Sequence, residues 1–298
     1  MRRETVFVWI VAMLSAELVL AEQRSTKNSI GMEFIEIETK EPESPENTVE
    51  LADPKKQEPR RISFLIGSPE NEEGRDADEN QVRKILISDY SLGKTEVTQG
   101  QWFQVMETEP WKAKPFTQEG ANYPATFISW DEAVAFCEKL TTLERNLKLL
   151  PVNEHYRLPT EVEWEFACRG PLQSPPRRSG AYSCKGGEEE LSEYAWTMNN
   201  TTALQHAHAH EVGLKKSNEW GFHDMHGNVW EWCLDGYSEK HTDDNVPVDT
   251  NKIWARVFRG GSWDTLPKGC RSASRNFFYP SLKTNSIGFR VARTNLKQ

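Results

Sequence analysis

Two carboxylates seven residues apart frame the segment best suited to hold a hard cation. Asp224 and Glu231 stand on either side of a Gly-Asn turn at Gly227 and Asn228. Such a turn can aim backbone carbonyls inward, and a cation such as Ca²⁺ prefers six to eight oxygen ligands at about 2.3–2.6 Å. The segment therefore predicts a calcium site. The alternative is a plain β-turn with capped carboxylates.

Three histidines form a second candidate site. His206, His208 and His210 alternate with alanine, so in a strand their imidazole rings would share one face. Three imidazoles on one face can form a zinc or copper site. Neither a fourth ligand nor a supporting carboxylate can be identified around them, which favours the alternative of solvated histidines in a loop.

The cysteines are the third group with chemical potential. The sequence has five, which is too few for a disulfide scaffold, and the odd number leaves at least one thiol unpaired within the chain. Their spacing leaves several pairings open.

The composition excludes two large classes of protein. The 36 Lys and Arg residues stand against 45 Asp and Glu, so the net charge is −9 and the pI is about 5.4. This balance argues against a nucleic-acid binder held by phosphate contacts. The mean hydropathy is −0.70, and no apolar run of about 18 residues follows the first 21, which excludes a multi-span membrane protein.

The first residues are typical of a secretory signal. Residues 1–21 place Arg2 and Arg3 ahead of an apolar stretch and the small Ala21 at the expected cleavage point. We therefore expect export to the periplasm or the extracellular space, and no membrane span once the signal is removed. Residues 22–27 are predicted to be a short linker.

A charged tract interrupts the first strands. Residues 38–61 hold four prolines among many charges, and we predict a disordered insertion because such a tract cannot bury a packed face. Apolar runs predict strands on both sides of it, at residues 30–37 and 62–66, so the insertion is interpreted as part of a hairpin.

Helices and short strands must position these candidates. Thr98 is predicted to be the N-cap of a helix, and Ser129 and Thr160 each stand three residues before Glu at the start of an apolar-periodic run, which is the signature of a capping box. Beyond Arg169 the helical periodicity stops. Turn residues then separate short apolar runs that predict strands at residues 229–234, 257–258 and 289–292. These elements favour an irregular, loop-rich α+β domain.

Three segments together resemble the formylglycine-generating enzyme (sulfatase-modifying factor) family. They are residues 156–170, residues 221–232, and Arg259-Gly-Gly-Ser-Trp263 followed by Ile287-Gly-Phe-Arg290. The resemblance extends to residues 28–32 and 94–98, and so to nearly the whole chain after the signal. It implies the α+β class and a single irregular domain of C-type-lectin-like fold, which we place at residues 28–294, with a tail at residues 295–298.

The resemblance also implies calcium ligands. In the family the segment at 224–231 holds Ca²⁺, and its ligands fall here on the side chains of Asp224 and Glu231 and the carbonyls of Gly227 and Val229. The family's second calcium loop belongs within residues 194–212, where this sequence lacks the acidic pattern. We therefore predict no second calcium site.

A substrate groove is implied above the Gly-Gly-Ser segment, with Ser262, Trp263 and Trp230 along it. The two glycines before Ser262 permit the close backbone approach that a groove floor needs. Since Trp buries a large area wherever it packs, we interpret Trp230, Trp232, Trp254 and Trp263 as core aromatics, with a ligand platform as the alternative.

Copper chemistry depends on two cysteines. Active members of the family hold Cu(I) with cysteines three and eight residues beyond that serine, which correspond here to Thr265 and Cys270. A hydroxyl cannot replace a thiolate as a soft Cu(I) ligand, so the first copper ligand is missing. The resemblance also implies a disulfide between Cys168 and Cys270. Cys137 is expected to be a buried free thiol or a partner of Cys233.

Three functions are compatible with these residues. The first is an exported, non-catalytic binding or accessory member of the family, stabilised by Ca²⁺ and taking a protein, peptide or glycan in a surface groove. The alternative is a copper-dependent oxidase that converts a sulfatase cysteine to formylglycine with O₂, with Cys270 as its remaining catalytic residue. The third is a different oxidative chemistry at the histidine cluster.

Overall fold

The computed structural model describes residues 24–38, 62–86, 89–170, 180–184, 186–201, 207–241 and 254–295. The expected signal at residues 1–21 lies outside the described residues, as do nearly all of the insertion at 38–61 and His206. Within the described part of the chain, none of the helices combines the length and the apolar character needed to cross a bilayer.

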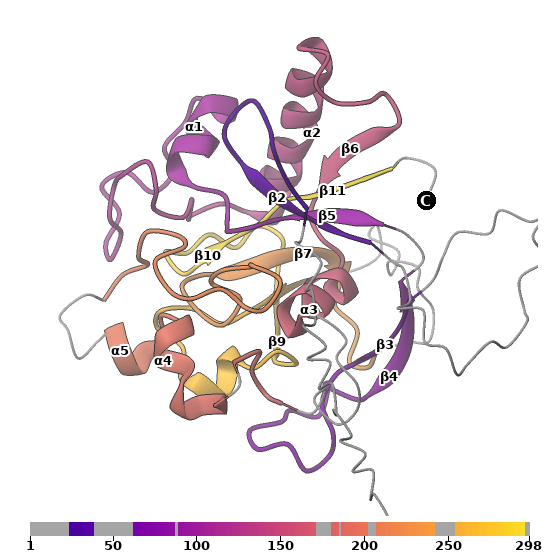
Figure 1. Ribbon diagram of the computed structural model, residues 1–298. Coiled ribbons are helices and arrows are strands. Elements are labelled where there is room, and N and C mark those ends of the chain that lie inside the picture. Colours follow the sequence, from indigo (N-terminus) through magenta and orange to yellow (C-terminus); the bar gives the residue numbers. More distant parts are fainter. Residues whose placement is uncertain are drawn as a thin grey trace, which may run out of the picture.

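The larger of two sheets joins the two ends of the domain (Figure 1). All of its neighbouring strands are antiparallel, in the order β1 (Ser25–Lys27), β2 (Glu33–Ile37), β5 (Tyr90–Gly93), β11 (Ala292–Asn295) and β6 (Glu154–Arg157). Because β11 lies between β5 and β6, the last described strand closes the sheet that the first strands open.

The second sheet carries the segments of the family resemblance. Its order is β10 (Ile287–Gly288), β7 (Trp230–Gly236), β8 (Arg256–Arg259) and β9 (Arg275–Phe278). The parallel pairing of β10 with β7 sets Gly288 opposite Glu231. This register brings the residues that follow β10 to the predicted calcium segment.

A separate two-stranded ribbon corrects the hairpin interpretation of the insertion. Strand β3 (Ile62–Ile66) pairs with β4 (Val82–Leu86) and not with β2. Both edges of β2 are already taken, by β1 and by β5, so β3 has no edge of β2 on which to pair.

The three longer helices begin where the sequence predicts. They are α1 (Gln99–Met106), α2 (Trp130–Asn146) and α3 (Glu161–Arg169), and the short α4 (Leu191–Tyr194) and α5 (Met198–Thr201) follow. Thr98, Ser129 and Thr160 each accept a hydrogen bond from the backbone three residues on, and the side chain there bonds back to the cap. The predicted capping boxes at Ser129 and Thr160 are confirmed, and the predicted N-cap Thr98 also forms a capping box, with Gln101.

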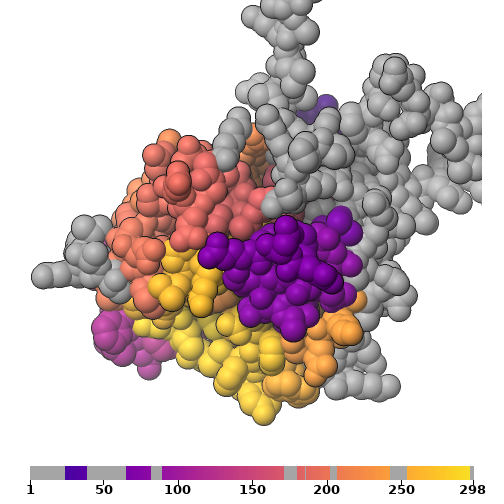
Figure 2. Space-filling model, turned by 90° about the horizontal axis from the view of Figure 1, so that it is seen from below, coloured from indigo at the N-terminus to yellow at the C-terminus, as the bar shows by residue number. Residues whose placement is uncertain are grey.

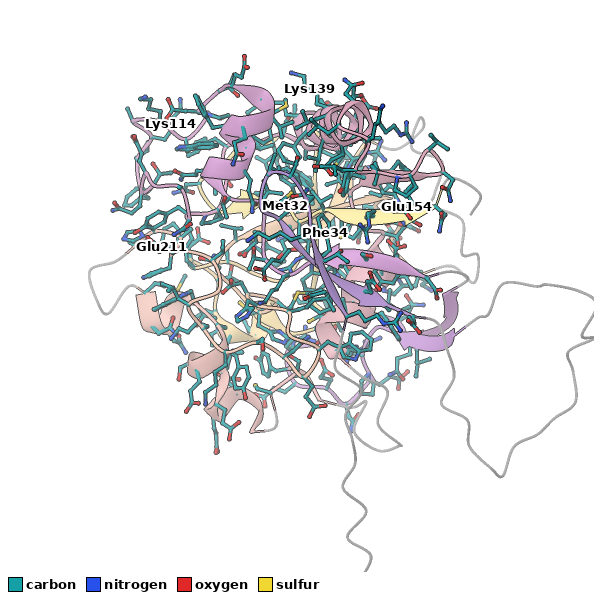
Figure 3. The ribbon with its side chains drawn as sticks, turned by 45° about the horizontal axis from the view of Figure 1, so that its top comes forward. Met32, Phe34, Lys114, Lys139, Glu154 and Glu211 are labelled. Carbon is teal, nitrogen blue, oxygen red and sulfur yellow. The ribbon has the colours of Figure 1, made fainter. Side chains whose placement is uncertain are left out.

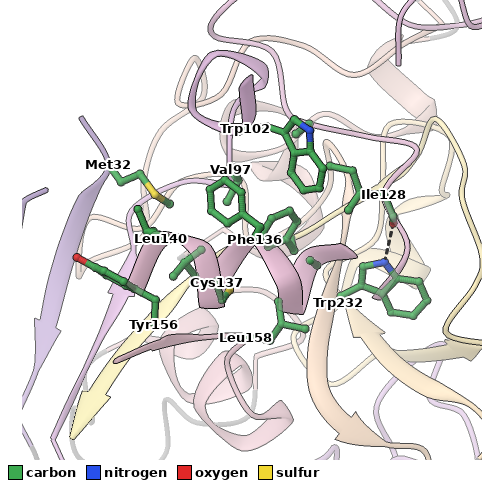
Figure 4. Packing of buried hydrophobic residues seen from close by; sticks show 14 of the residues in the cluster. Met32, Val97, Trp102, Ile128, Phe136, Cys137, Leu140, Tyr156, Leu158 and Trp232 are labelled. Atoms are coloured by element: carbon green, nitrogen blue, oxygen red, sulfur yellow. Dashed lines mark hydrogen bonds between the residues drawn. The ribbon is translucent and has the colours of Figure 1, made fainter. Parts of the chain in front are cut away.

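Aromatic rings fill the core between α1, α2 and the sheets (Figure 4). Trp102 stacks on Phe136 with 5.5 Å between ring centroids, and Trp232 donates to the carbonyl of Ile128 at 3.1 Å. Trp230, Trp232 and Trp263 are buried as predicted for core aromatics, but Trp254 is 58% exposed, so that prediction was wrong. Trp254 packs from outside against Phe277 and Tyr279.

The predicted strand at residues 289–292 is displaced. Strands β10 and β11 leave residues 289–291 between them. The backbone carbonyls of Phe289 and Val291 still accept hydrogen bonds, from Val97 and Gly93, while the side chain of Arg290 between them is fully buried.

Candidate functional site

Glu231 uses both of its carboxylate oxygens inside the protein. Arg290 donates to Oε2 and Oε1 at 2.5 and 2.6 Å, and the indole of Trp164 donates to Oε2 at 2.7 Å. The side chains of Glu231 and Arg290 are completely buried. Burial opposes the charge of Arg290, but Glu231 outweighs it and raises the pKa of the guanidinium. The pair therefore stays ionised and joins β7 to the segment after β10.

Asp224 and Glu96 belong to the same buried cluster. Unlike Glu231, each of them uses only one of its two oxygens in hydrogen bonds to other residues. Asp224 Oδ2 accepts from the backbone of Gly213 at 2.7 Å, and Glu96 Oε1 accepts from the amide of Asn228 at 2.9 Å. Asp224 Oδ1 and Glu96 Oε2 bond to no other residue, and, against the raising effect of burial, a hydrogen bond between the two side chains lowers the pKa of Asp224. Burial, followed by the nearby Asp224 and Glu231, raises the pKa of Glu96 well above its usual value, and burial also raises that of Asp224. Glu96 therefore favours its protonated form.

The predicted calcium ligands fit a cation only in part. The structure brings Asp224 and Glu231 into one cluster, but Glu231 already binds Arg290 and Trp164. Gly227 packs so tightly that an added Cβ would lie 2.2 Å from the carbonyl oxygen of Trp196. In the described segments, no group of three or more His, Cys, Asp or Glu residues is placed to hold a metal. Calcium binding thus stays a prediction, with Asp224 as its best-placed ligand.

Glu96 is the buried acid that sequence reasoning missed. It lies in the block at residues 94–98, which was assigned to the family resemblance and given no role of its own. An acid between Thr95 and Val97, next to the cap of α1, was the available signal. The contact depends on Asn228, 132 positions away, so local pattern alone does not reveal it.

The implied disulfide between Cys168 and Cys270 is not formed, and all five cysteines are free thiols. The sulfur of Cys168 lies 3.7 Å from His226 Nε2, whereas that of Cys270 lies 3.9 Å from the carbonyl oxygen of Thr265. Each sulfur is thus engaged by other groups. The alternative pairing of Cys137 with Cys233 is not formed either, which agrees with the expected free, buried Cys137.

His226 connects the two thiol segments as a neutral ring. Its Nδ1 lies 2.8 Å from the carbonyl oxygen of Cys270, which can only accept, so Nδ1 carries the proton. Nε2 is then the acceptor for the backbone N–H of Ser183 at 3.0 Å. Burial lowers the pKa of His226 to about 4 and raises that of Cys168 to about 12. These values describe a protonated thiol and an uncharged imidazole at neutral pH.

A short chain of hydroxyl groups occupies the position of the missing copper ligand. Ser262 Oγ donates to Asp264 at 2.5 Å, so the hydroxyl of Thr265, 2.7 Å from Ser262 Oγ, is the donor to Ser262. Cys270 is fully buried, and burial raises the pKa of its thiol to about 12. The place where two thiolates would meet therefore holds one hydroxyl and one protonated thiol.

The residues implied to border the groove are buried. Ser262, Trp263 and Trp230 are 0%, 5% and 8% exposed, so they do not form the walls of an open groove. Trp230 in particular packs edge-on against Phe258 in the core. The exposed ring at this place is Phe116, whose centroid lies 6.5 Å from that of Trp263. No sequence motif marks Phe116.

Two of the three clustered histidines take part in a ring stack. His210 lies flat on Trp196 with 3.8 Å between centroids, and His208 follows at 5.0 Å. The ammonium of Lys215 lies 3.9 Å from the centroid of the same Trp196 ring. His206 lies outside the described residues. Ring packing thus joins the two ends of the segment where the family has its second calcium loop.

The acidic loop between β3 and β4 is held down by an arginine. Arg271 donates to Glu72 at 2.7 Å and to Glu79 at 2.5 and 2.8 Å, and both Arg271 and Glu79 are buried. Figure 2 shows the loop, in purple, against the yellow segment that contains Arg271. Glu72 and Glu79 therefore hold the loop against the segment after β8.

Comparisons with known proteins agree with the resemblance in the sequence. A family model described as "Sulfatase-modifying factor enzyme 1-like domain" matches residues 47–295. Chaperone protein LppX of Paenibacillus barcinonensis is 30% identical over 61% of this chain and 71% of its own length. A formylglycine-generating enzyme of Streptomyces coelicolor is 29% identical over 57% of this chain and 52% of its own. An inactive Cα-formylglycine-generating enzyme 2 of Bos taurus is 26% identical, over 64% and 58%. The chain thus spans little more than half the length of these last two relatives.

Solved structures confirm the fold. PvdO of Pseudomonas aeruginosa matches with a TM-score of 0.69 and 22% identity, and Treponema denticola variable protein 1 with a TM-score of 0.64 and 26% identity. Each match covers 91% of this chain and 98% of the solved chain. The fold is therefore the predicted α+β, C-type-lectin-like one.

Proposed function

Since this chain belongs to the sulfatase-modifying factor enzyme 1-like family, we propose that it is a non-catalytic binding or accessory member. One observation carries the proposal. The position of the first copper cysteine holds Thr265, whose hydroxyl is hydrogen-bonded to Ser262. A Cu(I) site with two thiolate ligands cannot form where only one sulfur is available.

The state of the remaining sulfur supports the same conclusion. Cys270 is fully buried, and its pKa near 12 keeps the thiol protonated at neutral pH. A thiolate is the form that binds metal and reacts, so Cys270 is suited to packing and not to oxidation chemistry. The formylglycine-generating oxidase remains the alternative against which the proposal is tested.

The relatives are compatible with a non-catalytic role. Proteins described as formylglycine-generating enzymes, as an inactive enzyme of that kind and as a chaperone all match this chain at similar identity. A shared fold therefore does not imply a shared reaction. We propose an exported protein that binds a protein, peptide or glycan on the face where Phe116 is exposed.

The test asks whether the protein oxidises a substrate cysteine to formylglycine. Purified protein without its signal is incubated with Cu(I), O₂ and a Cys-x-Pro-x-Arg peptide, and mass spectrometry follows the substrate thiol. We expect no aldehyde, while an authentic formylglycine-generating enzyme in parallel converts the peptide. Aldehyde formation by this chain would overturn the proposal.

A variant separates two possible obstacles to copper binding, the absence of a sulfur at position 265 and the burial of Cys270. Thr265→Cys restores the first sulfur but leaves Cys270 buried, and Thr265→Ser is its matched control of similar size. If Thr265 alone blocks copper, Cu(I) competition titration will show binding by the Cys variant and none by the Ser variant. Tight Cu(I) binding by the unmodified protein would count against the proposal.

A further inference from the structure

A shallow pocket opens beside the exposed Phe116, away from the buried cysteines. Its empty space is about 190 Å³, the adjoining open solvent included. Its nine lining residues come from four segments of the chain, which are Gln99, residues within 116–126, Ala209 and Asn285. Lys114 and Glu211, which belong to the loops that supply most of this lining, lie on the same side of the molecule in Figure 3. So shallow a depression does not enclose a ligand, and it suits contact with one face or edge of a ring of a larger molecule.

The chemistry of the lining is polar and uncharged. Five of the nine residues carry an amide or an aliphatic hydroxyl, and none of the nine carries a charge. An anionic or a cationic ligand would find no partner for its charge here, and it would lose hydration on entry. The pocket is therefore suited to a neutral ligand that has several hydrogen-bonding groups.

Most of these polar groups are not used by the protein. Gln99 and Thr117 are the exceptions: the Gln99 amide oxygen accepts from Gly120 at 3.0 Å and its nitrogen donates to the carbonyl of Gln118 at 2.7 Å, and the Thr117 hydroxyl donates to the carbonyl of Lys114. The side chains of Gln118, Tyr123, Thr126 and Asn285 make no hydrogen bond to any other group that the structure describes. Thr126 is only 2% exposed as a residue, and its hydroxyl lines the pocket, where solvent or a ligand can reach it. Such a group is normally satisfied by water or a ligand.

An aromatic ring stands at the edge of the pocket in a strained backbone conformation. Phe116 has φ of 55° and is 63% exposed. A bulky residue in the left-handed region is unfavourable, and such strain persists where surrounding contacts enforce it. Here the hydroxyl of Thr117 bonds to the carbonyl of Lys114, and the amide of Lys114 bonds to Trp111, so the turn is held on both sides of Phe116.

We propose that this pocket binds one monosaccharide ring of a neutral glycan. A sugar presents hydroxyl groups to amide and hydroxyl side chains at its edges, and its C–H face packs on an aromatic ring. Phe116 and Tyr123 supply the rings, while Thr126, Gln118 and Asn285 supply the unused polar groups. An extended peptide would also require backbone pairing, and the pocket lining lies outside every named strand. The inference rests on the proposed binding function and names its ligand class.

The test measures binding of four probes to the purified chain without its signal. Methyl glucoside, methyl galactoside, methyl mannoside and N-acetylglucosamine are presented at millimolar concentration, and saturation-transfer NMR detects contact. We expect at least one of them to bind. Phe116→Ala and Thr126→Val should each weaken that binding about tenfold.

Phe103→Ala is the matched control. Phe103 is 51% exposed on α1 and is not part of the pocket lining, so its replacement should leave sugar binding unchanged. Circular dichroism and melting temperature establish that each variant is folded. The proposal is wrong if none of the four sugars binds, or if binding survives both pocket variants. It is also wrong if glucuronic acid binds as well as its neutral counterpart.

These outcomes are separable from the copper test. If no sugar binds and no aldehyde forms, the glycan inference fails while the non-catalytic function stands. If a glutamine- or asparagine-containing peptide binds in place of the sugars, the ligand class is wrong but the binding function is supported. Aldehyde formation would reject the non-catalytic function, whatever the sugars do.

Discussion

The buried cluster around Glu231 and the pocket beside Phe116 use polar groups in opposite ways. In the cluster, Glu231 and Arg290 have no exposed side-chain surface, and they bind each other through two hydrogen bonds. In the pocket, uncharged side chains such as Asn285 and Thr126 keep their hydrogen-bonding capacity. The most strongly charged region is thus structural, and the region open to a ligand is neutral.

Other arginines repeat the structural use of charge. Arg259 donates to the buried Glu165 and to three backbone carbonyls, and Arg275 donates to Glu161 at 2.7 and 3.0 Å. The acids lie on α3, whereas the arginines lie on β8 and β9. Ion pairs of this kind join a helix to a sheet across many residues of sequence. An acidic or basic residue in this fold is therefore a poor guide to the ligand.

The largest loss of stability is expected when Arg290 of the buried cluster is replaced. Arg290→Met should lower the free energy of unfolding by about 3–5 kcal/mol, because Glu231 would remain buried with an uncompensated charge. Urea denaturation measures the change. The matched control is Arg293→Met, in β11, whose guanidinium is 22% exposed and lies 3.5 Å or more from its acidic partners. It should cost about 1 kcal/mol or less.

A double variant sharpens this prediction. Replacing both partners, as in Arg290→Met with Glu231→Leu, removes the charge together with its partner. The double variant should be more stable than the sum of the single effects predicts, by at least about 1 kcal/mol. Simple additivity would show that the pair is not coupled in the way the geometry implies.

The second prediction concerns pH and a different acid near the start of α3. Asp235 accepts from the backbone of Glu161 at 2.6 Å. Burial, followed by the charge of Glu161, raises the pKa of Asp235 to about 7, while Arg157 partly opposes the shift. A folded-state pKa above the unfolded value of about 4 means that the stabilising contribution is complete below pH 4 and is lost as pH rises through 7.

Asp235→Asn should remove this pH dependence. The amide keeps an oxygen for the Glu161 backbone but cannot ionise, so the variant should gain about 4 kcal/mol relative to the unmodified protein as pH rises from 4 to 8. Urea unfolding at several pH values measures the difference. Parallel stability curves for the two proteins would contradict the assigned pKa.

The third prediction tests calcium through the unsatisfied half of the cluster. If Ca²⁺ binds, it should replace the proton that Glu96 shares with Asp224, bind their Oε2 and Oδ1 oxygens, which contact no other residue, and raise the melting temperature by a few degrees. Asp224→Ala should abolish the rise, whereas Asp264→Ala, which alters an exposed acid elsewhere, should preserve it. A melting temperature that is the same in Ca²⁺ and in chelator would remove the predicted site.

Two kinds of feature could be predicted from the sequence: those that depend on residues close together in the chain, and those shared with the resembled family. The N-cap at Thr98 and the capping boxes at Ser129 and Thr160 depend on residues close in sequence, and all of them formed. The contact of Glu96 with Asn228 depends on how distant segments fold together, and it was missed. Phe116 was missed for a related reason, because its exposure and positive φ result from a turn that no motif specifies.

The smallest change in stability is expected for a pocket residue, and it tests directly whether the pocket differs from the buried cluster. Thr126→Val removes a hydroxyl that has no protein partner and keeps the size of the side chain. In the pocket this change should alter the free energy of unfolding by less than about 0.5 kcal/mol, because the hydroxyl has no protein partner to lose. Thr201→Val is the matched control, since the Thr201 hydroxyl donates to the carbonyl of Trp263 at 2.7 Å and its loss should cost about 1 kcal/mol or more. Equal losses in the two variants would mean that Thr126 is already satisfied within the protein, and the pocket would then lose one of the unused polar groups that point to a ligand.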